Sequence, residues 1–163
     1  MNLKNTIAII LLTQLAWGCH KSERPFVIAQ VCLQSIEDKE DFIALLREAA
    51  QSEGMTFKNS SAKTVTELDA ISKITPHYTV SSKIINIGLI GSDGFGATAS
   101  NIGMPDNQIA VGFSKGKRPK QARLFSRTLV ARIEKRWKVE LISGEYGARG
   151  MSDCEISQHV SPP

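Results

Sequence analysis

Apolar residues alternate and cluster along the chain in a pattern that predicts strands and helices in mixed order. Residues 26–33 form a continuous run rich in β-branched side chains, which is typical of a buried strand. Over residues 83–91 and 108–113, apolar side chains occupy every second position, so two strands are expected there and should pair as an antiparallel hairpin. Shorter patterns at residues 55–57 and 138–142 predict a second and a final strand.

Apolar side chains spaced three and four residues apart predict helices between these strands. The first helix should begin near Ser35, which forms a capping box with Asp38, and should end at Gly54. A shorter helix is expected to begin at a second capping box, Thr64 with Glu67. A third helix is expected with Pro119 at its first position, where a proline is well suited. Its apolar stripe consists of Ala122, Phe125, Leu129 and Ile133, with Trp137 near its end.

The order of these elements predicts an α+β fold in a single domain. An antiparallel sheet of about five strands, with two or three helices packed on one face, is the simplest way to bury the apolar stripes. A ferredoxin-like topology is one candidate. We expect the domain to span residues 25–154 and residues 155–163 to form a flexible tail.

The first 18 residues have the layout of a secretory signal peptide. One positive charge, Lys4, precedes an apolar run at residues 7–12. A transmembrane anchor is the alternative, but a span needs about 20 apolar residues, and Gln14 interrupts this shorter segment. Removal of residues 1–18 leaves about 145 residues, the common size of one domain.

The end of this segment, Leu15-Ala16-Trp17-Gly18-Cys19, resembles a bacterial lipobox, in which a small residue precedes a cysteine that receives lipid. The leucine usually lies one position closer to the cysteine, and Trp17 is larger than usual. Residues 16–18 also fit the small-x-small pattern of an ordinary cleavage site. The resemblance implies that Cys19 carries acyl chains such as palmitate and that residues 19–24 form a lipidated N-terminus and tether. Ordinary cleavage would instead leave Cys19 as a free thiol.

Three cysteines occur in the chain, and an acylated Cys19 leaves an even number. Cys32 and Cys154 can then form a disulfide in an oxidising compartment. That disulfide would close nearly the whole processed domain. Two unpaired buried thiols are the alternative.

Residues 92–107 form a stretch rich in turn-forming residues: Gly94, Gly96, Gly103 and Pro105. Long connections of this kind are often functional. Alternatively, residues 97–102 extend the flanking strands and only the tip is a loop. Phe95 is either an exposed contact residue or a core residue folded back. If the loop binds a partner, we expect Asp93, Phe95, Met104 and Asp106 to make the contacts.

Motifs for catalysis and for metal or cofactor binding are absent from the sequence. The glycines near residue 91 match neither a dinucleotide fingerprint nor a phosphate-binding loop. No histidines or cysteines have zinc-ligand spacing, and no nucleophile elbow is present. We therefore expect a protein that is not an enzyme and that has no metal and no cofactor.

Basic residues are concentrated between residues 115 and 138, where ten occur against Glu134 alone. The third helix is therefore amphipathic and basic, and Arg118, Arg123 and Arg127 are candidate partner-binding residues. Stacking aromatics are not interleaved with these cations, which argues against nucleic acid as the partner. Anionic lipid, a cell-wall polymer or an acidic protein are the remaining choices, and a solvated helix face is the alternative.

The single α+β domain, the lipobox-like segment and a cysteine pair near the two ends of the domain resemble small periplasmic lipoproteins that act as immunity proteins against antibacterial effectors. The resemblance is to a class, and its only motif residue is Cys19. It implies a periplasmic location and a secreted toxin as protein partner. His20 replaces the aspartate that commonly retains lipoproteins in the inner membrane, so a lipid anchor in the outer membrane is expected. An envelope structural or assembly factor, binding anionic lipid or cell-wall polymer through the basic helix, is the alternative function.

Overall fold

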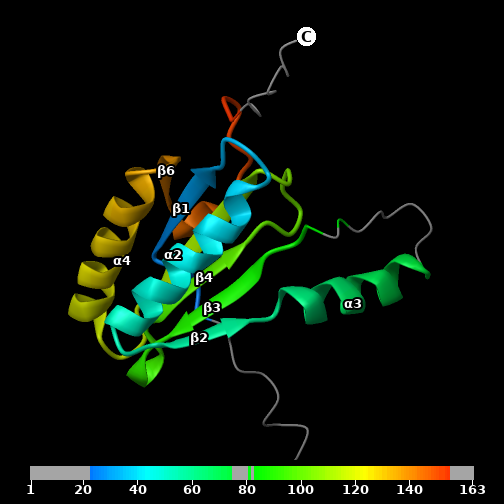
Figure 1. Cartoon of the computed structure of the whole chain (residues 1–163). Coiled ribbons are helices and arrows are strands. Elements are labelled where there is room, and N and C mark those ends of the chain that lie inside the picture. Colours follow the sequence, from blue (N-terminus) through cyan, green and yellow to red (C-terminus); the bar gives the residue numbers. More distant parts are fainter. Residues whose placement is uncertain (1–22, 75–80, 82, 155–163) are drawn as a thin grey trace, which may run out of the picture.

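Six antiparallel strands form one sheet in the order β2-β3-β4-β5-β1-β6 (Figure 1). The structure is a computed structural model that describes residues 23–74, 81 and 83–154. The strands are β1 (Val27–Cys32), β2 (Thr56–Asn59), β3 (Asn86–Ile90), β4 (Gly96–Ser100), β5 (Gln108–Ser114) and β6 (Lys138–Ser143). The helices are α2 (Asp38–Ser52), α3 (Ser61–Ser72) and α4 (Pro119–Glu134). The chain is thus a single α+β domain, as its sequence predicts.

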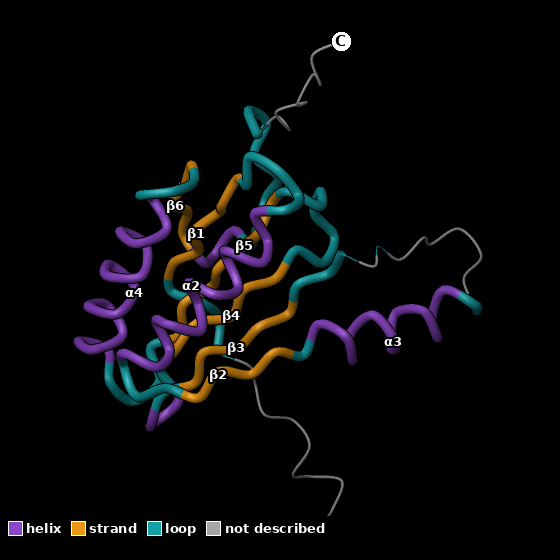
Figure 2. The backbone as a smooth tube through the Cα atoms, viewed as in Figure 1, coloured by secondary structure: helices purple, strands orange, loops and turns teal. Residues whose placement is uncertain are grey.

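Helices α2 and α4 lie side by side on one face of the sheet (Figure 1). The core lies between them and the inward side chains of the central strands, which include Val31, Leu89 and Val111. Helix α3 is different, because it extends beyond the strands and buries only Thr64 (Figure 2). Two helices therefore pack on the face where two or three were predicted.

The connections β1-α2-β2 and β5-α4-β6 both cross the same face and join strands that run in the same direction. This double crossover is the basis of a ferredoxin-like arrangement. Here four consecutive strands, β2 to β5, form a meander between the crossovers, where that arrangement has two. The sheet accordingly has six strands where about five were predicted.

The predicted hairpin between residues 83–91 and 108–113 is wrong, because β4 lies between β3 and β5 and pairs with both. The strand consists of small residues, GATAS, which carry little of the β-branched signal of a strand. At Gly96 the backbone of the neighbouring strand β3 leaves no room for a side chain. A Cβ atom on Gly96 would lie 2.0 Å from the Leu89 carbonyl oxygen.

The two hydrogen bonds of the predicted capping box are present, but α2 begins at Asp38, with Glu37 in place of Ser35 at the N-cap position. The Asp38 N–H donates to Ser35 Oγ at 3.3 Å, and Asp38 Oδ2 accepts from the Ser35 N–H at 3.1 Å. The prediction for α3 is wrong at its start, because the helix begins at Ser61 and Thr64 lies within its first turn. The Thr64 hydroxyl oxygen instead accepts a hydrogen bond from Asn86 Nδ2 at 2.8 Å, which ties the helix to β3.

The segment after β6 packs across the second face of the sheet, over β1 and β5. The Gln108 side chain accepts from the Met151 N–H at 2.7 Å and donates to the Met151 carbonyl at 3.1 Å. A disulfide then joins Cys154 to Cys32 at the end of β1. The predicted disulfide is present, and it holds residues 144–154, the C-terminal strap, against the sheet. The predicted signal peptide, Cys19 and the predicted tail from residue 155 lie outside the described residues.

Candidate protein-binding site

The loop predicted over residues 92–107 is two separate turns joined by β4. Asp93 and Phe95 lie at one end of this strand, and Met104 and Asp106 lie beyond the other end. Five strand residues of about 3.4 Å each separate the two turns by roughly 17 Å. The four residues therefore do not form one contact surface. The alternative, in which residues 97–102 belong to strand, is close to the structure, where β4 spans Gly96–Ser100.

Phe95 is a core residue. Its side chain is 9% exposed, and its ring meets that of Phe125 at a centroid distance of 6.3 Å, edge to face. Phe125 in turn packs against Phe113 at 6.1 Å. Phe95 thus joins the turn before β4 to helix α4. In this conformation its side chain is not available as an anchor for a partner.

Asp93 and Arg118 are partners of each other, with Arg118 Nε 2.5 Å from Asp93 Oδ2. Asp93 adopts a left-handed conformation with φ of 64°, and its carbonyl accepts from the Lys117 N–H at 2.9 Å. These bonds fix the turn before β4 to the start of α4. Both residues therefore have a structural role that their sequence context does not reveal.

Met104 and Asp106 lie in the turn before β5, and both are half-buried. The Met104 N–H donates to the Asn101 carbonyl at 3.0 Å, and Asp106 Oδ2 accepts from the Ser81 hydroxyl at 3.1 Å. This turn connects β4 to β5 at the end of the two strands opposite Asp93.

The basic residues around α4 divide into those with a described partner and those without one. Lys115 lies over the Phe26 ring, Arg132 donates to Ser52, Arg136 lies over Trp137, and Lys138 pairs with Asp153. Within the part of the chain that the structure describes, Lys117, Lys120, Arg123, Arg127 and Lys135 form no ion pair. The predicted residues Arg123 and Arg127 are in this second group, one helical turn apart.

Arg123 and Arg127 line a groove between α4 and the strands β1 and β6. The groove encloses about 430 Å³, and its other lining residues are Phe26, Val27, Ser126, Val130, Glu134 and Leu141. Half of the eight lining residues are apolar, and Leu141 among them is 54% exposed; Glu134 is the one acidic residue of the lining, beside the two arginines. Leu124, 68% exposed on α4, adds an apolar side chain beside the arginines. An apolar surface bordered by cations is suited to binding an acidic protein segment.

The groove adjoins an edge of the sheet. Among the described residues, β6 pairs only with β1, so one side of its backbone has no strand beside it. Sequence reasoning missed this contribution from Val27 and Leu141. The alternation over residues 138–142 predicts a strand, but a single sequence carries no signal that places it at an edge.

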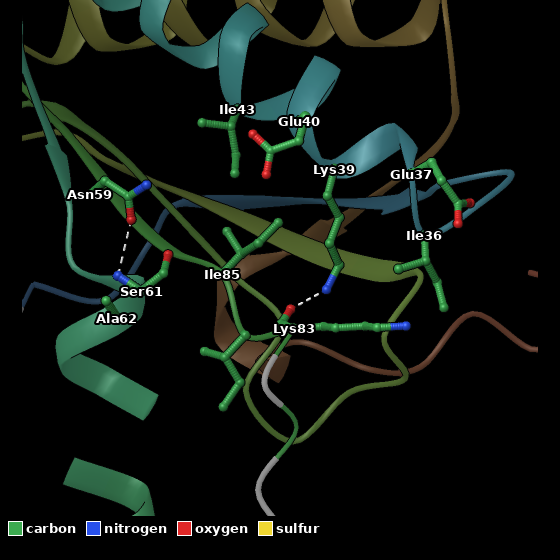
Figure 3. A pocket seen from close by; sticks show the side chains of 11 residues that line it. Ile36, Glu37, Lys39, Glu40, Ile43, Asn59, Ser61, Ala62, Lys83 and Ile85 are labelled. Carbon is green, nitrogen blue, oxygen red and sulfur yellow. Dashed lines mark hydrogen bonds between the residues drawn. The ribbon is translucent and has the colours of Figure 1, made fainter. Parts of the chain in front are cut away.

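A second hollow, of about 660 Å³, lies between the first turns of α2 and α3 and the chain entering β3 (Figure 3). The Lys39 side chain points into it and donates to the Lys83 carbonyl, which also accepts from Asn101 Nδ2 at 3.2 Å. Lys39 is only 7% exposed, and its burial lowers its pKa despite the opposing effect of Asp106. Its ammonium group is used to tie α2 to β3, so the hollow presents no free cation at this position.

Within residues 23–74, 81 and 83–154, no three metal-binding side chains lie together in a group that could hold an ion. None of the helices in those ranges combines the length and the apolar composition that a membrane span requires. Comparison of the chain with protein-family models, with curated proteins and with solved structures gave no significant match. The function of this chain is therefore inferred from its own sequence and geometry.

Proposed function

We propose that this chain is an exported lipoprotein that binds a protein partner through the groove between α4 and β6, and that it acts as an immunity protein neutralising an antibacterial effector. One observation carries the binding proposal. Arg123 and Arg127 border an apolar groove at a sheet edge and form no ion pair among the described residues. An acidic partner would give these cations counter-charges and would cover Leu141.

A protein partner fits this surface better than an anionic polymer does. A lipid head group or a wall polymer can be held by cations alone and does not require a groove lined by Val27, Val130 and Leu141. A folded protein gains free energy from covering such side chains, at about 25 cal/mol for each Å² of apolar surface removed from water. The apolar lining thus favours a protein over the envelope polymer of the alternative function.

The location of the protein supports the immunity proposal. The signal peptide and the lipobox-like segment ending at Cys19 would place the domain in the envelope. A disulfide between Cys32 and Cys154 suits an oxidising compartment such as the periplasm. An antibacterial effector that acts there would meet a lipid-anchored binding protein at its site of action.

The test begins with affinity capture of the tagged, processed protein from envelope extracts at moderate salt. The recovered partner is then titrated against the wild type, against Arg123→Glu/Arg127→Glu and against a matched control, Lys58→Glu/Lys73→Glu. The control changes the net charge equally but lies on β2 and at the end of α3. Loss of one charge pair at an interface commonly costs about 2 kcal/mol or more, which is about 30-fold in affinity. The arginine variant removes two pairs, so we expect at least about 100-fold weaker binding for it and little change for the control.

Two results would contradict the proposal. Equal weakening by both double variants would show that net charge matters and the groove does not. Recovery of lipid or wall material alone, lost as salt rises, would favour the envelope-factor alternative. The immunity function is tested separately by deleting the gene and challenging the cells with co-encoded toxins, since unchanged sensitivity to all of them would exclude it.

A further inference from the structure

The free side of β6 offers backbone hydrogen-bonding groups next to the groove. The Leu33 N–H donates to the Asn107 carbonyl at 2.8 Å, which assigns the odd-numbered residues of β1 to the ladder with β5. The even-numbered residues of β1 then bond to β6, opposite Lys138, Glu140 and Ile142. It follows that Val139 and Leu141 direct their N–H and C=O groups away from the sheet.

We propose that the occupant of the groove is an extended acidic segment of the partner protein, which adds to β6 as a seventh strand. This inference rests on the proposed function and specifies how the partner is held. Main-chain hydrogen bonds to an exposed sheet edge provide affinity in this mode of recognition, and pockets for alternate side chains provide specificity. Both parts are present here, because the edge of β6 and the groove beneath α4 share Leu141.

The spacing of the arginines matches an added strand. Arg123 and Arg127 are four residues apart on α4, a rise of about 6 Å along the helix. Residues i and i+2 of a strand lie on the same face about 6.8 Å apart. Two acidic residues with one residue between them can therefore reach the two guanidinium groups. Glutamate fits best, because its methylene groups would lie against the apolar lining while its carboxylate meets an arginine.

Two features that commonly block strand addition, a bulge and a proline, are absent from β6. All six of its residues pair with β1 in continuous register, and its charged residues are Lys138, which pairs with Asp153, and Glu140. The other edge strand, β2, has four residues and leads directly into α3, where Asn59 Oδ1 accepts from the Ser61 N–H. Only the β6 edge thus combines a longer strand with an adjoining basic groove.

A second copy of this chain is a poor occupant. Pairing of two β6 edges would bring the Arg123 and Arg127 side chains of both copies to one interface, and like charges placed opposite each other are destabilising. An acidic segment reverses the sign of that interaction. Charge complementarity therefore selects a different protein over self-association.

The test uses defined peptides and the processed, ¹⁵N-labelled protein. The probe is acetyl-Thr-Val-Glu-Val-Glu-Val-Thr-amide, which places both glutamates on one face of a strand. The control, acetyl-Thr-Val-Glu-Glu-Val-Val-Thr-amide, has the same composition but places them on opposite faces. We expect the probe to shift the amide resonances of Val139 and Leu141 and to slow their hydrogen exchange, and we expect the control to bind about tenfold more weakly because it can engage only one arginine.

Backbone methylation separates strand addition from simple charge attraction. One version of the probe carries N-methyl groups on its glutamates and the other carries them on its valines. Only one of these alternate sets can face β6, so one version should bind about tenfold or more weakly while the other binds as the probe does. Because the modification is in the peptide, folding of the protein is not affected.

The outcomes distinguish strand addition to β6 from binding in the groove without strand addition. Equal binding of both methylated versions, with shifts near Arg123 and Arg127, would overturn strand addition and leave the proposed function standing. The absence of any shift in β6 at millimolar probe would also overturn it, and the captured partner would then test the groove alone. As a second check, Leu141→Pro removes one outward N–H and no ladder bond, so it should abolish binding of the captured partner, whereas Leu141→Val should retain it.

Discussion

Removal of the disulfide should destabilise the domain by an amount that its loop length determines. Cys32 and Cys154 are 122 residues apart, so the bond restricts nearly the whole unfolded chain. The chain-entropy relation for a loop of this length gives about 5 kcal/mol at 25 °C. Since small domains are stable by about 5–15 kcal/mol in total, Cys32→Ala/Cys154→Ser should be marginally stable or unfolded.

The measurement is urea-induced unfolding followed by the fluorescence of Trp137. This residue is buried, and its ring packs edge to face on Phe42 at 5.5 Å, so unfolding should change its emission. Trp17 is the only other tryptophan and would be removed with the signal peptide. Wild-type protein in reductant serves as a control and should unfold as the double variant does.

The native contacts of the strap separate two explanations of the effect. Gln108 holds Met151 by two hydrogen bonds, so the strap can remain in place when the disulfide is absent. If the bond acts on the unfolded chain, the Met151 N–H of the double variant should exchange as slowly as the amides of the central strands, because both would then open only by global unfolding. A loss of less than about 1 kcal/mol would refute the chain-entropy reasoning for this protein.

Three further changes test the packing of the domain. Gln30 Nε2 is buried and has no hydrogen-bond partner among the described residues, so Gln30→Met should raise the free energy of unfolding by about 1 kcal/mol. A lower free energy of unfolding in urea would contradict this. Burial lowers the pKa of Lys39 in the folded protein below its ordinary value of 10.5. Between the folded and the unfolded pKa the unfolded chain binds more protons, so the free energy of unfolding should rise with pH up to about 10.5. Unfolding curves measured over a pH series should lose that rise in Lys39→Met. Gly96→Ala should lower the free energy of unfolding by about 3 kcal/mol, because its Cβ would meet the Leu89 carbonyl. Gly54→Ala should lower it by about 1 kcal/mol, because Gly54 has a φ of 63° but open space around it. Equal melting temperatures of the two variants would refute this difference.

The sequence predicts those elements whose local pattern and tertiary environment agree. Helix α4 carries a clear apolar stripe and begins at Pro119, and its boundary was predicted correctly. The capping box at Ser35 and Asp38 depends on groups within one turn, so it can be recognised from the sequence alone. Strand β1 is buried over most of its length and has the continuous apolar run that such strands require.

Failures arise where distant contacts decide the structure. Strand β4 was not predicted as a strand of its own because its small residues carry little strand signal, and its position depends on pairing with both β3 and β5. Thr64 matches a capping box, but Asn86 from β3 bonds to it within the helix. The candidate site was predicted in part, since Arg123 and Arg127 border the groove. The edge position of β6 was not predicted, because it depends on the order of the strands in the sheet, and the local pattern of apolar residues does not determine that order.

The two components of the proposed site should govern different rate constants. Arg123 and Arg127 are exposed. At physiological ionic strength, salt therefore largely screens their attraction for an acidic segment that is more than about 8 Å away. Added salt, like Arg123→Glu/Arg127→Glu, should therefore lower the association rate. Contacts with Leu141 and backbone bonds to β6 form only after docking, so Leu141→Pro should raise the dissociation rate and leave association nearly unchanged. A stopped-flow series in salt on the captured partner measures both constants, and a salt-dependent dissociation rate with constant association would show that the arginines act within the bound complex and do not steer the encounter.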